Sequence, residues 1–501
     1  MLLVEAINSK IWVLLIPSLM FSTEMVFGRR RSSHSSRDSI PNSDSEEEET
    51  PPDQYFEQKL DHFNLSNSET WQQRYFANWS YYTPTGPAFL IIEGESWAYS
   101  DEVIVNPWVS FAETFKGVIF HLEHRFYGKS VPKNDTRTEN LVYLSSQQAL
   151  ADIAYFIQGI TKQYYLSDDI KWIVFGCSYA GSLAAWVRMK YPSLVHGAVA
   201  SSAPILAKKD FGEYYEVVKA SLDSYHPNCS SRIAEATQEL DRLIKTEAGR
   251  KHITKLFLLC TELQDKLSEI ASFFRLLANR VSYIAQYDKG HRKSNNEIPP
   301  RRSIEFLCDI MTYSDASALN LYAAVHVLNL VQNDWNCAHH DDKFLIEEWK
   351  KTDIDTILAG SGERQWFYQT CTEFGYYQRF TTTSDTFGIH LPSEQNVEIC
   401  EKVFGPEFNE TRLKNGIYRT NTIYGGLQVN VGNLIFVHGS KDPWHPLGIT
   451  RVESENSPYE VVFINGTAHC SDTNYYDKER DEVKEARKKI KNIVQSWLQN
   501  K

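Results

Sequence analysis

The 501-residue sequence predicts an α/β fold in which a mostly parallel sheet carries helices on both faces. Short apolar runs alternate with helical segments between residues 87 and 204, which is the pattern of successive βαβ units. One run ends in a turn of small residues around Ser178, and two later runs end in loops that hold Asp442 and His469. The chain is 42% hydrophobic and can therefore bury a large core.

The first 53 residues are predicted to lie outside this fold. Residues 1–28 are typical of a signal peptide, because the apolar core at 11–21 is too short to span a bilayer; a signal anchor is the alternative. Residues 29–53 are rich in serine and charge and contain almost no apolar side chains, so we expect a disordered or removable pro-segment. No later stretch is long and apolar enough to predict a membrane span.

The first part of the core is predicted to cover residues 54–205. Apolar runs at 88–92, 118–122 and 197–201 predict buried strands, and the periodicity of 146–164 predicts a helix between them.

A further strand at 170–175 leads into Gly176-Cys177-Ser178-Tyr179-Ala180-Gly181, and a helix follows that ends before Pro192. A strand, a tight turn of small residues around a serine, and a helix make up the nucleophile elbow of α/β-hydrolases. Ala180 departs from the five-residue form of that motif. The alternative for this turn, taken alone, is that its resemblance to the motif arose by chance.

Residues 206–350 show a different sequence pattern, with helical periodicity and few strand-like runs. Helical periodicity dominates 233–244, 256–286 and 317–331, and we predict a helical cap insertion over the serine. The second part of the core, 351–501, is predicted to hold strands at 434–438 and 460–464 and a closing amphipathic helix at 478–499.

The two C-terminal strands place a candidate acid and a candidate base after the serine. Asp442 follows the first of these strands and His469 follows the second. The order Ser178, Asp442, His469 is the chain order of the α/β-hydrolase triad, in which a carboxylate supports an imidazole that takes the proton of a hydroxyl nucleophile. The oxyanion would be bound by the N–H of Tyr179 and by the loop after strand 88–92, at Gly94 and Glu95. An ordinary turn glycine is the alternative for Gly94.

Composition excludes several other classes of function. The net charge is −12 and no Lys/Arg-rich stripe occurs, so we expect no nucleic-acid partner. No Cys-x-x-Cys pair occurs, and we expect neither a metal nor a cofactor.

The eight cysteines of a secretory chain predict disulfides, but Cys177 and Cys470 are expected to be free because of their positions in the elbow and beside His469. The remaining six allow fifteen pairings. Glycosylation sequons stand at Asn64, Asn78, Asn134, Asn228 and Asn409, and a sixth, at Asn465, is in the predicted histidine loop.

Five blocks of sequence make the chain resemble the serine carboxypeptidase family that contains lysosomal proline-X carboxypeptidase, dipeptidyl peptidase II and thymus-specific serine protease. The blocks are residues 56–64, residues 123–128, the elbow, residues 368–375, and the Asp442 and His469 loops. Residues 371–375 and 420–426 resemble the thymus-specific branch most.

The resemblance implies a serine exopeptidase that acts on peptides and favours cleavage after proline, either a carboxypeptidase or a dipeptidyl peptidase. It also implies a protein of the secretory pathway with a lysosomal, endosomal or extracellular location. It also leaves open a homodimer. It implies the disulfides Cys229–Cys308, Cys260–Cys337 and Cys371–Cys400, without the fourth bridge of the carboxypeptidase.

For the substrate pocket, the resemblance implies Trp444 as an aromatic wall and Ser182 as a substrate-binding residue; a packed core tryptophan is the alternative for Trp444. Glu95, Glu123 and Arg125 are expected to bind a peptide terminus or, more simply, to pair with one another. An ester or lipid hydrolase on the same fold and a catalytically silent binding protein are the alternative functions.

Overall fold

The computed structural model describes residues 50–288, 303–353, 362–380, 386–388, 390, 394–474 and 479–499. The predicted signal peptide and most of the predicted pro-segment lie outside these ranges. Asp53, at the end of that segment, is described and forms ion pairs with Arg74 and Lys129. Within the described ranges, no helix combines the length and the apolar character that a bilayer span requires.

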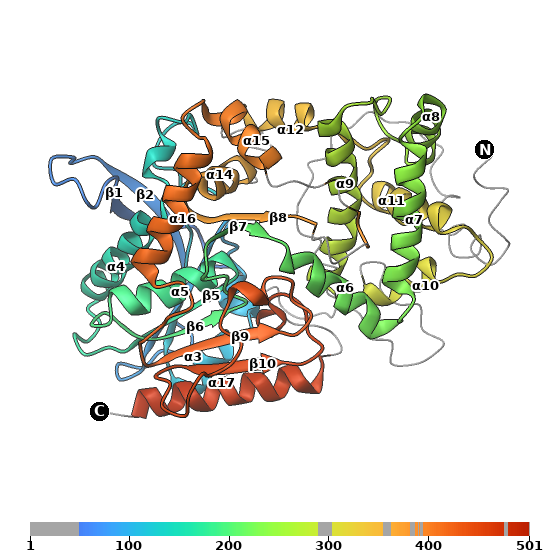
Figure 1. Ribbon diagram of the computed structural model, residues 1–501. Coiled ribbons are helices and arrows are strands. Elements are labelled where there is room, and N and C mark those ends of the chain that lie inside the picture. The colour runs from blue at the N-terminus through green and yellow to red at the C-terminus, as the bar shows by residue number, and fades with distance from the viewer. Residues whose placement is uncertain are drawn as a thin grey trace, which may run out of the picture.

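A central eight-stranded sheet has the strand order β1-β2-β4-β3-β5-β6-β9-β10 (Figure 1). β1 and β2 pair antiparallel, as do β2 and β4, and all other neighbours pair parallel. The strands are β1 (Gln54–Lys59), β2 (Thr70–Asn78), β3 (Ala88–Ile92), β4 (Val118–Leu122), β5 (Trp172–Cys177), β6 (Val195–Ser201), β9 (Leu434–Gly439) and β10 (Glu460–Ile464). The predicted mostly parallel α/β-hydrolase core is confirmed. The antiparallel strands β1 and β2 were not predicted.

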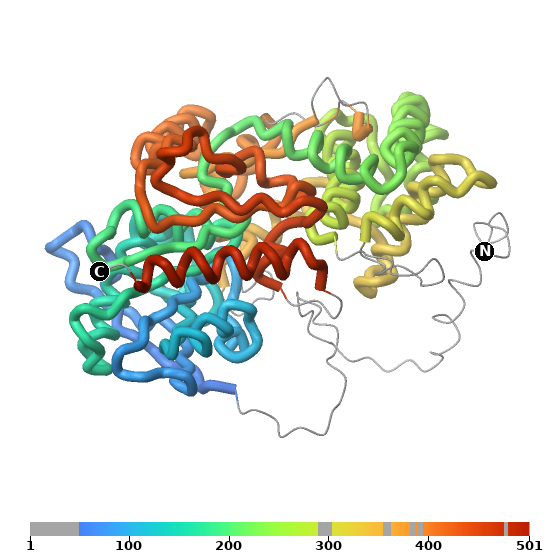
Figure 2. Tube along the Cα trace, turned by 90° about the horizontal axis from the view of Figure 1, so that it is seen from below, coloured from blue at the N-terminus to red at the C-terminus, as the bar shows by residue number. Residues whose placement is uncertain are grey.

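Alternating side chains of the strands pack into two separate hydrophobic cores, one on each face of the sheet. In β3, Leu90 and Ile92 point to the core that includes α4 (Ser146–Gln163) and α5 (Tyr179–Lys190). Phe89 and Ile91 point to the opposite core, beneath α3 (Val109–Phe115) and the C-terminal helix α17 (Asp481–Gln499). Figure 2 shows α17 running along its face of the sheet. Because both faces are covered, β3 is apolar throughout and β4 is apolar except for His121.

A helical region lies to one side of the sheet (Figure 1). Its helices are α6 (Glu213–Tyr225), α7 (Cys229–Leu243), α8 (Glu247–Leu256), α9 (Leu267–Gln286), α10 (Ile304–Met311) and α11 (Ala318–Gln332). The next helix, α12 (Asp342–Trp349), lies between α9 and α15 (Glu394–Phe404) (Figure 1). The continuous helical pattern expected over 256–286 is wrong at its start, because residues 257–266 leave the helix. There Cys260 bonds Cys337, and Leu259 forms a β-bridge with Ala338, which holds the chain between two helices.

The chain returns to the core through a smaller unit. α14 (Glu363–Gln369) runs into a π-helical turn, η3 (Thr370–Phe374), and then into β8 (Gly375–Gln378), which pairs parallel with β7 (Lys208–Phe211) in a second sheet. α15 (Glu394–Phe404) and α16 (Glu410–Tyr424) follow, and Tyr424 stacks on Trp186 of α5 at a centroid distance of 4.1 Å. The pair β7 and β8 was not predicted, because its strands are short and far apart in sequence.

Candidate active site

Ser178 occupies a strained turn between β5 and α5. Its φ is +61° and its ψ is −127°, a backbone conformation that non-glycine residues rarely adopt. The Ser178 N–H donates to the carbonyl of Ser201 at 2.9 Å, and the Ser178 carbonyl accepts from the N–H of Ser182 at 3.0 Å. These bonds hold the strained residue at the start of α5, as a nucleophile elbow requires.

Two glycines make this turn sterically accessible. A Cβ on Gly176 would lie 2.1 Å from the carbonyl oxygen of Ala180, and one on Gly181 would lie 2.5 Å from that of Ser201. Strand and helix therefore cross at a distance that only glycine allows at these positions.

Asp442 and His469 meet at the carboxyl ends of β9 and β10. His469 Nδ1 lies 2.8 Å from Asp442 Oδ1, and the same oxygen accepts the backbone N–H of Trp444 at 2.9 Å. Burial works to raise the pKa of the fully buried Asp442, but the neighbouring His469 and the two hydrogen bonds hold the pKa below its ordinary value. A carboxylate that stays ionised can orient the imidazole and stabilise its cation.

The serine and the histidine are joined through their chain neighbours. Cys177, directly before Ser178, forms a disulfide with Cys470, directly after His469, across a sequence separation of 293 residues. The expectation that both cysteines are free is wrong, because the elbow and the histidine loop lie at the same edge of the sheet. Within the described residues, no hydrogen bond joins the Ser178 hydroxyl to His469; catalytic hydrogen bonds often tighten only when substrate is bound.

The other six cysteines pair as the resemblance implied. Cys229 bonds Cys308, Cys260 bonds Cys337, and Cys371 bonds Cys400. Together with Cys177–Cys470 they make four disulfides within the described residues. The absence of the carboxypeptidase's own fourth bridge stays a prediction. No described cysteine is free.

The loop after β3 lies against the start of α5, where an oxyanion site would form. A Cβ built on Gly94 would lie 3.0 Å from the backbone nitrogen of Ala180 and 3.4 Å from the ring of Tyr179. The Tyr179 side chain points away from solvent, and its hydroxyl accepts from Gln369 at 2.9 Å. Burial, and then repulsion by Glu93, raise the pKa of Glu95, while His469 opposes the rise. The roles of the Tyr179 N–H, Gly94 and Glu95 in binding an oxyanion stay predictions.

Trp444 lies in an aromatic cluster beside His469. Its ring centroid is 6.5 Å from that of His469 and between 5.5 and 5.6 Å from those of Phe211, Tyr214 and Tyr376. The side chain is only half-buried, so it packs in this cluster and still meets solvent.

Ser182 lies behind the same cluster. It is buried, and its hydroxyl donates to the Pro204 carbonyl at 3.1 Å; the Tyr376 hydroxyl donates to the same carbonyl. Substrate binding by Ser182 or Trp444 stays a prediction.

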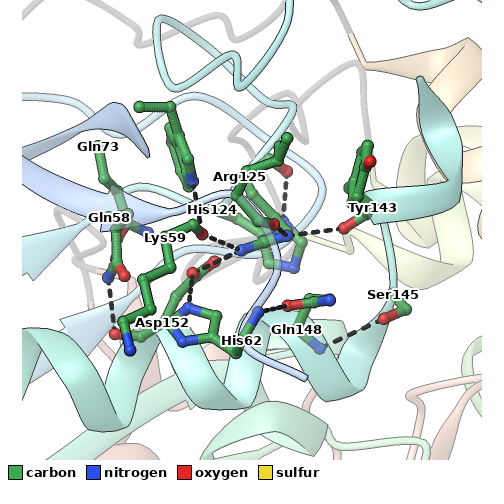
Figure 3. Close-up of polar contacts among 12 residues, drawn as sticks. Gln58, Lys59, His62, Gln73, His124, Arg125, Tyr143, Ser145, Gln148 and Asp152 are labelled. Carbon is green, nitrogen blue, oxygen red and sulfur yellow. Dashed lines mark hydrogen bonds and ion pairs between the residues drawn. The ribbon is translucent and has the colours of Figure 1, made fainter. Parts of the chain in front are cut away.

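Glu123 and Arg125 do not pair with one another. Glu123 is buried and pairs with Arg74, and its carboxylate also accepts the Ser130 hydroxyl at 2.7 Å. Arg125 donates to both oxygens of the buried Asp152, at 2.6 Å each, and His62 joins the same carboxylate (Figure 3). Both residues are engaged inside the core, so their block of sequence stabilises the fold rather than binding a peptide terminus.

Gln286, at the end of α9 in the helical region, was missed by sequence reasoning. Its carbonyl accepts the N–H of His469 at 3.0 Å, and its side-chain oxygen accepts from Trp444 Nε1 at 3.0 Å and from the Tyr214 hydroxyl at 2.8 Å. The next residue, Tyr287, lies edge-on to His469 at a centroid distance of 6.1 Å. No local signal identifies a glutamine on an amphipathic helix, so only the tertiary structure brings the end of α9 to His469.

The predicted glycosylation sites differ in their surroundings. Asn64, Asn134 and Asn228 are exposed. Asn78 is half-buried and its side-chain nitrogen donates to the Val103 carbonyl at 2.8 Å, while Asn409 caps the start of α16. Modification at all five stays a prediction.

Comparison with known proteins finds matches over most of the chain. The model of the family described as serine carboxypeptidase S28 matches residues 58–490. A thymus-specific serine protease of Mus musculus is 32% identical over 468 residues, which cover 90% of this chain and 88% of that protein. Its Homo sapiens counterpart is 30% identical over 456 residues, covering 89% and 86%. A lysosomal Pro-X carboxypeptidase of Bos taurus is 27% identical over 431 residues, covering 83% and 81%. The matched range includes the helical region and all strands of the main sheet except most of β1.

Proposed function

We propose that Ser178, Asp442 and His469 are the catalytic triad of this chain, which belongs to the serine carboxypeptidase S28 family and is a serine-type peptidase. The 2.8 Å contact between His469 Nδ1 and Asp442 Oδ1 carries this assignment. The Cys177–Cys470 disulfide also joins the residue before Ser178 to the residue after His469, which fixes the strained serine near the histidine.

Each residue has a defined task in the proposed reaction. His469 takes the proton of the Ser178 hydroxyl while Ser178 Oγ attacks the carbonyl carbon of the scissile bond, and it then gives that proton to the leaving amine. Water hydrolyses the resulting acyl-enzyme with the same base. Asp442 holds the Nδ1 proton, which keeps Nε2 free to act on the serine.

The negative oxygen of the tetrahedral intermediate needs two donors. The Tyr179 N–H and the backbone around Gly94 and Glu95 are the proposed donors, supported by the close approach of Gly94 to Ala180. These groups are fixed by strand β3 and helix α5, so they do not have to reorganise as charge develops.

We propose that the enzyme is an exopeptidase that favours proline before the scissile bond. The half-buried indole of Trp444, next to His469 and surrounded by aromatic rings, offers a flat apolar wall that suits a pyrrolidine ring. Relatives named lysosomal Pro-X carboxypeptidase support the same preference. Ser182 is proposed to act from behind this pocket by holding the Pro204 carbonyl.

The four disulfides fit the secretory pathway, where such bonds persist. A lysosomal, endosomal or extracellular location is proposed from the names of the relatives.

The test uses the purified mature chain, its Ser178→Ala variant, a fluorophosphonate probe and a mixed peptide library at pH 5 and pH 7. Ser230→Ala, which changes a buried serine of the cap helix α7, is the matched control. We expect the probe to label the parent and the control but not Ser178→Ala, and we expect products that end or begin next to proline. The sequences of the products decide which end of the peptide is trimmed.

Other results would change the proposal. Labelling of Ser178 with hydrolysis of esters but not of peptides would favour an ester hydrolase. The absence of labelling in folded protein at both pH values would overturn the catalytic role and leave a binding function.

A further inference from the structure

Three side chains that commonly bind metals come together next to the nucleophile. One ligand atom each of Cys177, His469 and Cys470 lies within 4.8 Å of the other two. This is the one group of its kind within the described part of the chain. Cys177 is the last residue of β5, whereas His469 and Cys470 lie in the loop after β10, so sequence spacing could not indicate the group.

In the oxidised protein the two sulfur atoms are bonded to each other and are poor metal ligands. Reduction would leave two thiols beside an imidazole, and two cysteines with one histidine are a known ligand set for Zn²⁺ that keeps a fourth position open. The Nδ1 atom of His469 is already held by Asp442 at 2.8 Å, which leaves Nε2 as the nitrogen for a metal. A carboxylate behind a histidine in this way fixes the ring and strengthens the imidazole as a ligand.

We propose that the Cys177–Cys470 disulfide is a redox-controlled gate: once it is reduced, Cys177, Cys470 and His469 bind Zn²⁺ and block the active site. The reductant is a small thiol. Two thiol molecules become one disulfide as the protein's S–S bond becomes two S–H groups. Binding of Zn²⁺ then displaces the two thiol protons, forms two Zn–S bonds and one Zn–N bond, and oxidises or reduces nothing.

Zinc would inhibit the enzyme because it binds His469, the proposed general base. The lone pair of Nε2 that would accept the serine proton is occupied by Zn²⁺, so the base is lost although every triad residue is still present. General base catalysis typically contributes on the order of 10²–10⁴-fold to a rate, and a loss of that size is expected. This consequence rests on the proposed triad, whereas zinc binding by the three residues does not.

A thiol can reach this disulfide through Cys177, because its partner Cys470 is buried. Cys177 is half-buried at the elbow, where substrate must reach its neighbour Ser178. Cys229, Cys308, Cys371 and Cys400 are at most 1% exposed, so two of the other three disulfides are shielded. Cys260 and Cys337 are half-buried as well, but they lie in the helical region and form no metal-binding group there.

The test starts from the purified full mature protein, treated with dithiothreitol and freed of it under nitrogen. Zinc is titrated into oxidised and reduced protein, with bound metal measured after equilibrium dialysis and the serine measured by the rate of fluorophosphonate labelling. We expect the reduced protein to bind one additional Zn²⁺ per chain and to label on the order of 10² times more slowly, with full recovery after chelation. Co²⁺ in place of Zn²⁺ should give a thiolate charge-transfer band.

Three variants separate the explanations. Cys177→Ala/Cys470→Ala should show neither the additional zinc nor the inhibition. Cys260→Ala/Cys337→Ala, which removes the other half-buried disulfide, should behave like the parent. Ser178→Ala should still bind the zinc after reduction, so zinc binding is measured even if the proposed peptidase activity fails.

The proposal is overturned if reduced parent protein binds no additional zinc, or if zinc slows labelling equally in the Cys177→Ala/Cys470→Ala variant. Should that double variant not fold, Cys177→Ala alone leaves one thiol and must lose the additional zinc; retention would equally contradict the site.

Discussion

His469 and Trp444 share one oxygen of Asp442. The imidazole Nδ1 lies 2.8 Å from Asp442 Oδ1, and the Trp444 backbone N–H lies 2.9 Å from the same atom. The loop that carries the acid therefore orients its own carboxylate, and the oriented carboxylate sets the tautomer of the histidine. The indole of Trp444 begins the proposed proline pocket, so acid and pocket are built from three consecutive residues.

Asp442→Asn should lower kcat by about 10⁴-fold, because an amide in this position favours the wrong imidazole tautomer and cannot stabilise the cation. Steady-state peptide cleavage and fluorophosphonate labelling rates measure the loss. Asp472→Asn is the control: Asp472 is also buried and accepts the Ser201 hydroxyl at 2.5 Å, a bond that an amide oxygen preserves. A kcat within threefold of the parent for Asp442→Asn would contradict the assignment.

Gly94→Ala should lower kcat by on the order of 10²–10³-fold with little change in KM. The new methyl group would lie 3.0 Å from the Ala180 nitrogen and push the proposed oxyanion donors apart. Gly432→Ala, where the nearest atom would be 3.4 Å away, should retain parental kinetics. Equal kinetics for the two variants would remove the Gly94 loop from the oxyanion site.

Trp444→Leu should lower kcat/KM for proline-containing peptides by more than about tenfold and change alanine-containing analogues less, because the flat wall is lost while the backbone bond to Asp442 remains. Parallel kinetics on matched peptides give the ratio. Trp335→Leu removes a 46% exposed tryptophan of the helical region and should leave the ratio unchanged. An equal loss for both peptide series would make Trp444 a general packing residue.

Arg125→Met should destabilise the fold by about 3–5 kcal/mol, since it leaves the buried Asp152 without its cation. Arg125 also donates to the carbonyls of Leu60 and Tyr143, at 3.1 and 2.8 Å, and methionine restores neither bond. Urea unfolding measures the change. Lys251→Met breaks an exposed pair with Glu247 and should give no resolvable shift of the midpoint. A similarly small effect for Arg125→Met would contradict a structural role.

His326 should make the helical region sensitive to acid. Burial, and then repulsion by Arg280, lower the pKa of His326 to about 3, below its ordinary value of 6.5. The unfolded chain takes up a proton as the pH falls below about 6.5 while the folded chain does not, so stability falls by about 1.4 kcal/mol per pH unit down to the folded pKa.

The variant His326→Leu removes this dependence. When the pH is lowered from 7.5 to 4.5, the free energy of unfolding of the variant minus that of the parent should increase. Urea unfolding at both pH values measures this difference. His252→Leu changes an exposed histidine on α8 and should leave the difference constant. A constant difference for His326→Leu would show that the buried ring takes up its proton in the folded state as readily as in the unfolded one.

Much of the core could be predicted because its signals are local. The strands at 88–92 and 118–122 coincide with β3 and β4, since an apolar run bounded by turns is a property of a few adjacent residues. The elbow was identified in the same way, from small residues around Ser178. The non-helical stretch 257–266 was missed, because the Cys260–Cys337 disulfide that holds it joins residues 77 positions apart.

The sequence by itself determined the order of Ser178, Asp442 and His469 and the strands that carry them, because chain order and alternation of apolar residues are local properties. Only the tertiary structure decided that Cys177 bonds Cys470, that Arg125 pairs with Asp152 rather than Glu123, and that Gln286 of α9 contacts His469. Each of these contacts joins residues whose approach depends on how strands and helices pack, and that packing results from burial across the whole core rather than from any single segment.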